Sequence, residues 1–274
     1  MASGAVENLI AHWHDLPADA DDWIHPDDLD VLVDQRWSHL VRWDYPEQAD
    51  LVRGHPDRAA HMHAHLIPQP YVGDIRNAGI VLCLLNPGVD LGDYISERPG
   101  TEFRHRKIAN LRQEGIDSRY PFFEIDPDLA GSGAFRWWWP RLRKVVEAMV
   151  ADRHYYDDAV AIVAREVCSV ELVPYHSGTA PPGYEKLVRC LRSSRLAVEA
   201  VRERAGTSGS VEPLVLVFRG HRSWDLPDDG QRVRHVPAGR SIAFGAETTA
   251  GGLISEWMRR NYPADRTASA KSGT

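Results

Sequence analysis

Three apolar runs, each ending abruptly at polar or conformationally special residues, constrain the fold of this chain most. The runs span 79–85, 167–173 and 214–218, and a weaker one spans 232–236. The first three lead into Asn86-Pro87-Gly88, Tyr175-His176-Ser177 and Arg219-Gly220-His221. A short continuous apolar run bounded by a turn is typical of a strand buried on both faces. We therefore predict a sheet of short strands.

Helical patterns separate these runs. The first of these patterns begins at Pro140, the second spans Tyr184–Ala205, and the third spans Gly252–Arg260. Alternation of strands and helices predicts an α/β fold, a three-layer α/β/α sandwich with a short, mostly parallel central sheet. Ligands of such sheets bind beyond the carboxyl ends of the strands. The residues that follow the runs should therefore lie at one edge and form one site.

The chain divides into three parts by composition. Residues 1–70 are rich in Asp, His, Trp and Pro, with short helical patterns at 6–13 and 29–41. Pro17 and Pro26 interrupt any longer helix. We expect a helical N-terminal extension over 1–70, an α/β domain over 71–263 and a disordered tail of small polar residues over 264–274.

Composition excludes several classes of protein. Of 274 residues, 43% are hydrophobic and 26% charged, which is ordinary for a globular protein and rules out a collagen-like or wholly disordered chain. The net charge of −7 lacks the overall basic character of a sequence-reading DNA binder, although a local basic groove stays possible. No apolar stretch reaches the ~18 residues of a membrane span, and the start does not resemble a signal peptide. We expect a cytoplasmic protein that is not associated with membranes.

The turn Asn86-Pro87-Gly88 carries the sharpest functional signal. A tight turn after a strand places the Asn side chain and nearby backbone N–H groups at the sheet edge. An Asn amide can accept a hydrogen bond from water while it donates one to a substrate oxygen. The alternative is a plain turn, because Asn, Pro and Gly are all favoured in turns.

The segment LLNPG (84–88) resembles the first motif of the uracil-DNA glycosylase superfamily, in its thymine/mismatch branch. The spacing to VELVPYHS and LVLVFRGH resembles the strand order of that family, and the resemblance covers about residues 70–260. It implies that Asn86 orients the attacking water and that Pro87 and Gly88 approach the base and phosphate. It also implies DNA or a nucleotide as the partner. Three widely separated cysteines exclude the cluster-containing branches, so no cofactor is expected.

The later motif of the family is not matched cleanly. The family carries His-Pro-Ser or Asn-Pro-Ser there, and the best positional match is 236–241, with His235 one place early. His221 is the other candidate. We therefore consider His221 and His235 as catalytic candidates, and Arg240 and Ser241 as substrate-binding ones.

Glu171 stands where the uracil-specific branch of the family reads the base with an Asn. An ionised carboxylate only accepts hydrogen bonds, so it should repel O4 of uracil and accept from the amine of cytosine or adenine. This argues against plain uracil specificity. The alternative is that Glu171 pairs with an arginine such as Arg219 or Arg240.

Aromatic residues offer candidates for base stacking. The family stacks the flipped base on an aromatic from the loop after the first motif, which suggests Tyr120, Phe122 and Phe123. The alternative is that these rings hold the loop to the core. Three tryptophans at 137–139 cannot share one helix face, so at least one should be buried and another exposed. Tyr175 and His176 are further candidates for substrate binding.

His61, His63 and His65 alternate and could face one side of a strand as metal ligands. No acid or Cys motif follows at a standard spacing, and we expect no metal. The leading hypothesis is a glycosylase-like protein that binds a nucleobase and hydrolyses an N-glycosidic bond. The alternatives are a non-catalytic nucleic-acid or nucleotide binder on this fold, or a hydrolase using His176, His221 or His235. The last is disfavoured because no Gly-x-Ser-x-Gly turn is present.

Overall fold

A five-stranded sheet forms the centre of the molecule, in a computed structural model that describes residues 4–44, 61–89, 91–152, 154–209, 211–237, 242–245 and 247–263. The strand order is β3-β5-β4-β6-β7. Strand β3 is antiparallel to β5, and the other neighbours are parallel. The strands are β3 (Tyr71–Val72), β4 (Ile80–Leu84), β5 (Val167–Glu171), β6 (Leu214–Val217) and β7 (Val233–His235). This confirms the predicted α/β fold with a mostly parallel sheet.

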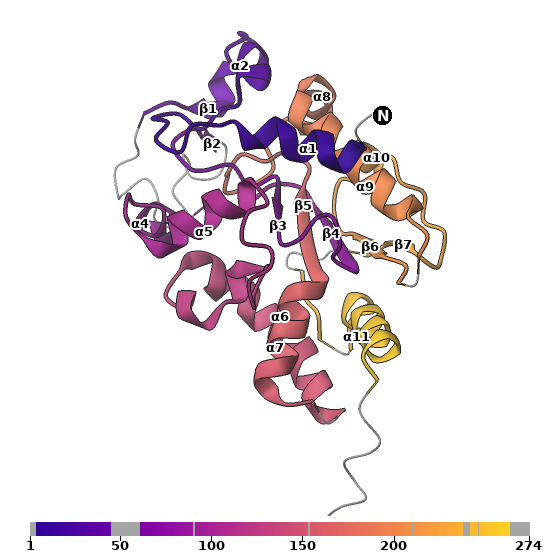
Figure 1. Ribbon diagram of the computed structural model, residues 1–274. Coiled ribbons are helices and arrows are strands. Elements are labelled where there is room, and N and C mark those ends of the chain that lie inside the picture. Colours follow the sequence, from indigo (N-terminus) through magenta and orange to yellow (C-terminus); the bar gives the residue numbers. More distant parts are fainter. Residues whose placement is uncertain are drawn as a thin grey trace, which may run out of the picture.

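Helices cover both faces of this sheet. Alternate residues of β4 belong to different apolar clusters: Val81 and Cys83 to one, Ile80 and Leu82 to the other. The first cluster includes residues of α1 (Ala5–His14) and α9 (Arg192–Gly206). The second includes residues of α6 (Gly133–Ala151), α7 (Tyr156–Glu166) and α11 (Thr249–Asn261). Figure 1 shows α1 and α9 above the sheet and α6, α7 and α11 below it, which confirms the three layers.

The connections of β5 run over opposite faces. Helices α6 and α7 precede β5 on one face, and α9 follows it on the other. Strand β4 pairs with β5 on one side and with β6 on the other. Where neighbouring connections of a parallel sheet diverge in this way, a crevice opens at the carboxyl ends of the strands.

The N-terminal helices are part of the core. On α1, Leu9, Ile10 and Trp13 are buried in the same cluster as Val81 and Cys83 of β4. The helical pattern predicted over 29–41 is shorter in the structure, where α2 (Pro26–Leu32) is followed by a 3₁₀ turn η1 (Ser38–Leu40) and by β1 (Val41–Arg42). Strand β1 pairs with β2 (Met62–His63). The predicted tail, 264–274, lies outside the described residues.

Helix α6 begins earlier than its sequence predicts. We placed the start at Pro140, but the helix begins at Gly133 and Pro140 lies inside it. The Ser132 side chain caps the helix by accepting from the Phe135 N–H at 3.0 Å. Pro140 lacks the backbone N–H that would donate within the helix. The burial of Trp138 and Leu142 on either side of it stabilises the helix despite this loss. The result is that Trp137 and Trp138 are helical residues.

The remaining elements connect these layers. They are α4 (Leu91–Ser96), α5 (Glu102–Leu111), η3 (Phe123–Ile125), η4 (Pro127–Leu129), α8 (Tyr184–Cys190) and α10 (His221–Trp224). None of the helices in the described ranges has the length and hydropathy needed to cross a membrane.

Candidate functional site

A cavity of about 350 Å³ lies at the carboxyl ends of β4 and β5. The turn after β4, the end of β5 and its following loop, η3 and the first half of α6 all contribute to its wall. Lining residues with polar or aromatic side chains include Gln69, Asn86, Asp93, Glu124, Trp137, Trp138, Arg141, Glu171, His176, Ser177, Thr179 and Arg219. The structure therefore places Asn86, Pro87, Gly88, Glu171 and His176 around one cavity.

Hydrogen bonds fix the side chain of Asn86. Its Nδ2 donates to Ser177 O at 2.9 Å, to Ser177 Oγ at 3.0 Å and to Pro87 O at 3.1 Å. Three oxygen acceptors around one atom identify that atom as the amide nitrogen. The amide oxygen is then the atom that can accept a hydrogen bond from water or a ligand. Since Ser177 N also donates to Pro87 O at 3.0 Å, the loops after β4 and β5 are tied together.

Glu171 is the last residue of β5 and lies opposite Leu84 of β4. Its side chain is 3% exposed, and Oε2 has no hydrogen-bond partner among the described residues. Burial raises the pKa of this carboxyl well above its usual range, the charge of Glu124 raises it further, and Arg219 opposes the shift. A protonated carboxyl both donates and accepts. The raised pKa favours the protonated acid, which can donate to a base as well as accept from it, unlike the acceptor-only carboxylate that the sequence suggests.

Glu124 lies on η3 and is a second buried acid in the wall of the cavity. The residue is 1% exposed, and its Oε2 has no partner in the described ranges. Burial raises the pKa of its carboxyl to about 8, against the opposing charge of Lys107. Nothing in the sequence around Phe123–Ile125 distinguishes this acid from a solvated one, and the sequence analysis missed it.

His176 is held in its neutral form. Its Nδ1–H donates to Gly88 O at 2.6 Å, and its Nε2 lies 2.7 Å from Lys107 Nζ, which donates to it. Burial and the charge of Lys107 lower the pKa of the imidazole well below its usual range. Lys107 in turn bonds Glu97 Oε1 at 2.5 Å. This buried chain of contacts fixes the backbone of the turn at Gly88.

The aromatic residue on the cavity wall that is accessible is Trp137, which is 40% exposed. The guanidinium of Arg141 lies 3.8 Å from the centre of its ring. Its neighbour Trp138 is 3% exposed and packs edge-on against Phe122. One tryptophan of the triplet is thus buried and another exposed, as predicted.

The aromatic residues predicted for stacking lie elsewhere. Phe122 and Phe123 are buried in the apolar cluster of the α6 face, and Tyr120 is partly buried against the same cluster. Tyr175 is 1% exposed, and its hydroxyl donates to Asp28 Oδ2 at 2.8 Å. These four side chains do not line the cavity.

The two histidine candidates for catalysis stack on each other, with ring centres 4.5 Å apart. Nε2 of His221 bonds Val217 O at 3.0 Å, and Nε2 of His235 bonds Leu226 O at 2.7 Å. Neither residue lines the cavity. Arg240 and Ser241 lie outside the described residues.

Comparison of the chain with protein-family models, with curated proteins and with solved structures gives no significant match.

Within the described residues, the ring nitrogens of the alternating histidines do not converge on one point as metal ligands would. His63 Nδ1 bonds the Tyr94 hydroxyl at 2.8 Å, and His65 bonds backbone carbonyls. Within the described residues, one group, His12, His25 and Asp27, brings three ligand atoms together. Both ring nitrogens of His25 are already used: Nε2 bonds His12 O at 2.7 Å, and Nδ1 accepts from Asp27 N at 3.1 Å. This group therefore does not support a metal site.

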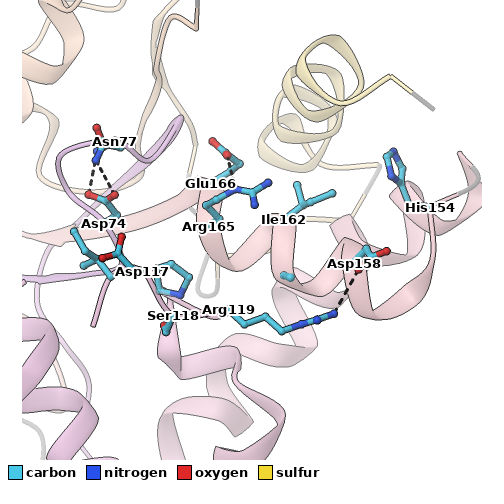
Figure 2. Close-up of a pocket in the computed structure, with 13 residues that line it drawn as sticks. Asp74, Asn77, Asp117, Ser118, Arg119, His154, Asp158, Ile162, Arg165 and Glu166 are labelled. Atoms are coloured by element: carbon cyan, nitrogen blue, oxygen red, sulfur yellow. Dashed lines mark hydrogen bonds and ion pairs between the residues drawn. The ribbon is translucent and has the colours of Figure 1, made fainter. Parts of the chain in front are cut away.

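A larger and more polar cavity of about 810 Å³ lies beside α7 (Figure 2). Several of its polar groups bond each other: Arg119 pairs with Asp158 at 3.4 Å, and Asn77 donates to Asp74 at 2.9 Å. The buried carboxylate of Glu166 in its wall accepts from the Tyr262 hydroxyl. These groups satisfy one another, whereas Glu124 and Glu171 in the cavity at the sheet edge each keep a carboxyl oxygen without a partner among the described residues.

Proposed function

We propose that the cavity at the sheet edge binds a nucleobase, and that the protein hydrolyses the N-glycosidic bond of a base in DNA in the manner of the uracil-DNA glycosylase superfamily. The observation that carries this proposal is that Asn86 and Glu171 share one cavity at the ends of adjacent parallel strands. The turn 86–88 resembles the first motif of that superfamily, and Glu171 occupies the position of its base-reading residue.

The contacts of Asn86 suit the positioning of water. Its amide nitrogen is bound by Ser177 and Pro87, so its oxygen can hold a water molecule. In the reaction, the oxygen of this water bonds to C1′ of the sugar as the C1′–N bond breaks, and the proton that the water releases ends on the departing base. Neutral Glu171 hydrogen-bonds the base edge, and Trp137 offers a ring for stacking.

The test is base release by the purified chain. The substrates are single- and double-stranded DNA that contain uracil, a mismatched thymine, a damaged base, or a mispaired adenine or cytosine, and strand cleavage at the abasic product provides the readout. Release of one of these bases supports the proposal. A chain that releases none of them contradicts hydrolysis.

A second candidate is a nucleobase or nucleotide binder without catalysis. It is favoured by the positions of His221 and His235, whose rings stack together away from the cavity. The catalytic histidine of the family's later motif then has no counterpart in the cavity wall formed by the described residues. Binding of a base or a base-containing oligonucleotide without release of the base would support this candidate.

A further inference from the structure

Folding stability does not explain why two buried glutamates line one cavity. Glu124 and Glu171 both line the cavity, and each is less than 4% exposed. Each also retains one buried carboxyl oxygen without a hydrogen-bond partner in the described part of the chain. A buried polar atom left unpaired costs about 1–3 kcal/mol, so two such atoms beside one cavity point to a ligand that satisfies them.

Neighbouring charges do not neutralise these acids through ion pairs. The buried amine of Lys107 is bonded to Glu97 and to His176. Among the ion pairs found in the described ranges, none includes Glu124 or Glu171. The acids come from different elements, Glu124 from η3 and Glu171 from the end of β5. They are therefore two separate hydrogen-bonding points on the wall.

We infer that Glu124 is a second ligand-contacting residue, and that with Glu171 it selects an uncharged nucleobase that can bond to two acid groups at once. This inference rests on the proposed function and specifies its ligand. A neutral carboxyl donates through its O–H and accepts through its carbonyl. That pair of groups matches the ring nitrogen and amine of adenine or cytosine. A cationic base would instead require ionised acids, which this buried wall disfavours.

The inference makes ligand binding depend on pH through Glu124. The charged groups that face it are Lys107 from α5, which lowers the pKa of its carboxyl, and Asp93 and Glu97 from α4 and the residue after it, which raise it. Burial dominates and brings that pKa to about 8. Glu171 of β5 lies on the same cavity wall. Above this pH Glu124 loses its donor, so the affinity for the base should fall.

The experiment measures binding of 9-methyladenine and 1-methylcytosine by calorimetry at pH 6.5 and pH 9.0. Methylation at the glycosidic nitrogen keeps both probes neutral over this range. The wild-type chain should bind the better of the two about ten-fold more weakly at pH 9.0. Glu124→Gln keeps a donor and an acceptor, so its affinity should equal that of the wild type at pH 6.5 within about three-fold and should not change with pH.

Two further variants complete the design. Glu124→Leu removes both hydrogen-bonding groups and should weaken binding at pH 6.5 by about ten-fold or more. Glu166→Gln changes a buried acid outside this cavity and should bind as the wild type does. If Glu124→Leu does not fold, the pH dependence of Glu124→Gln still decides the question.

The outcomes are distinguishable. Wild-type binding that persists unchanged in Glu124→Leu, or a pH dependence that persists in Glu124→Gln, overturns the inference and leaves the proposed function intact. A wild-type chain that binds neither probe also overturns the inference, whereas the proposed function is decided by base release from DNA.

Discussion

Single residues in this cavity derive their chemistry from their neighbours. Asn86 has its amide nitrogen bound by Ser177 and Pro87, which leaves its oxygen as an acceptor. Burial raises the pKa of Glu171 and of Glu124, which favours the carboxylic acid over the carboxylate at both positions. The residue types were visible in the sequence, but these protonation states depend on the surrounding protein.

Replacing Asn86 tests the proposed reaction. Asn86→Ala removes the acceptor for the attacking water, so base release should fall by ~10²-fold or more. Affinity for DNA should change little, because Trp137 and Glu171 remain in place. Single-turnover base release and DNA binding are measured on the same variant. The control is Asn77→Ala, which changes an exposed asparagine of the cavity beside α7. An equal loss of release in both variants would contradict the assigned role.

Replacing Glu171 tests its protonation. In the folded chain the pKa of Glu171 lies well above its unfolded value, so the folded state binds a proton that the unfolded state releases above about pH 4.5. The contribution of Glu171 to the stability of the wild-type chain therefore decreases as the pH rises above about 4.5. Glu171→Gln has no such proton, and its stability relative to the wild type should increase with pH. Urea denaturation at pH 5 and pH 8 measures this difference, and a constant difference would refute it.

At the scale of elements, the apolar runs predicted β4, β5 and β6 well because strands buried on both faces need apolar side chains at every position. Strand β3 has only Tyr71 and Val72, which is too short for a pattern to reveal. Helix α6 was predicted to start at Pro140 because the sequence does not show that burial of Trp138 outweighs a proline inside a helix. The packing of η3 near the end of β5, which brings Glu124 and Glu171 to one cavity, likewise cannot be predicted from the sequence.

Two aromatic residues beside Trp138 of α6 have different roles, Phe122 in packing and Trp137 in the proposed binding. Phe122 is completely buried against Trp138, so Phe122→Ala should cost ~3–5 kcal/mol of unfolding free energy. Trp137 is 40% exposed on the cavity wall, so Trp137→Ala should leave stability nearly unchanged. It should weaken nucleobase binding by ~1–3 kcal/mol. Chemical denaturation and base titrations of both variants check this division, and a base affinity unaffected by Trp137→Ala would remove Trp137 from the site.

At the scale of the whole molecule, buried histidines make folding sensitive to acid. Burial and the neighbouring His25 lower the pKa of His12 to about 4. The unfolded chain takes up a proton there below about pH 6.5, whereas the folded chain does so only near pH 4. Stability should therefore fall as the pH drops through this interval. His176 acts in the same direction, since its pKa is also lowered.

His12→Gln should remove part of this acid sensitivity. The expected result is a smaller decrease in the urea midpoint between pH 7 and pH 5 than the wild type shows. His14→Gln, at a half-exposed neighbour on the same helix, is the matched control and should keep the wild-type decrease. If the two variants respond alike, His12 does not contribute to the slope.

The packing of α1 against α9 also affects how the chain is made. Helix α1 leaves the ribosome before α9, which follows only after β5 has been synthesised (Figure 1). Until then Leu9, Ile10 and Trp13 have no α9 to cover them. Because nascent chains grow at roughly 5–20 residues per second, this apolar face stays open for several seconds or more. Chaperones that bind exposed apolar helices would therefore meet this protein at α1, before α9 has been made.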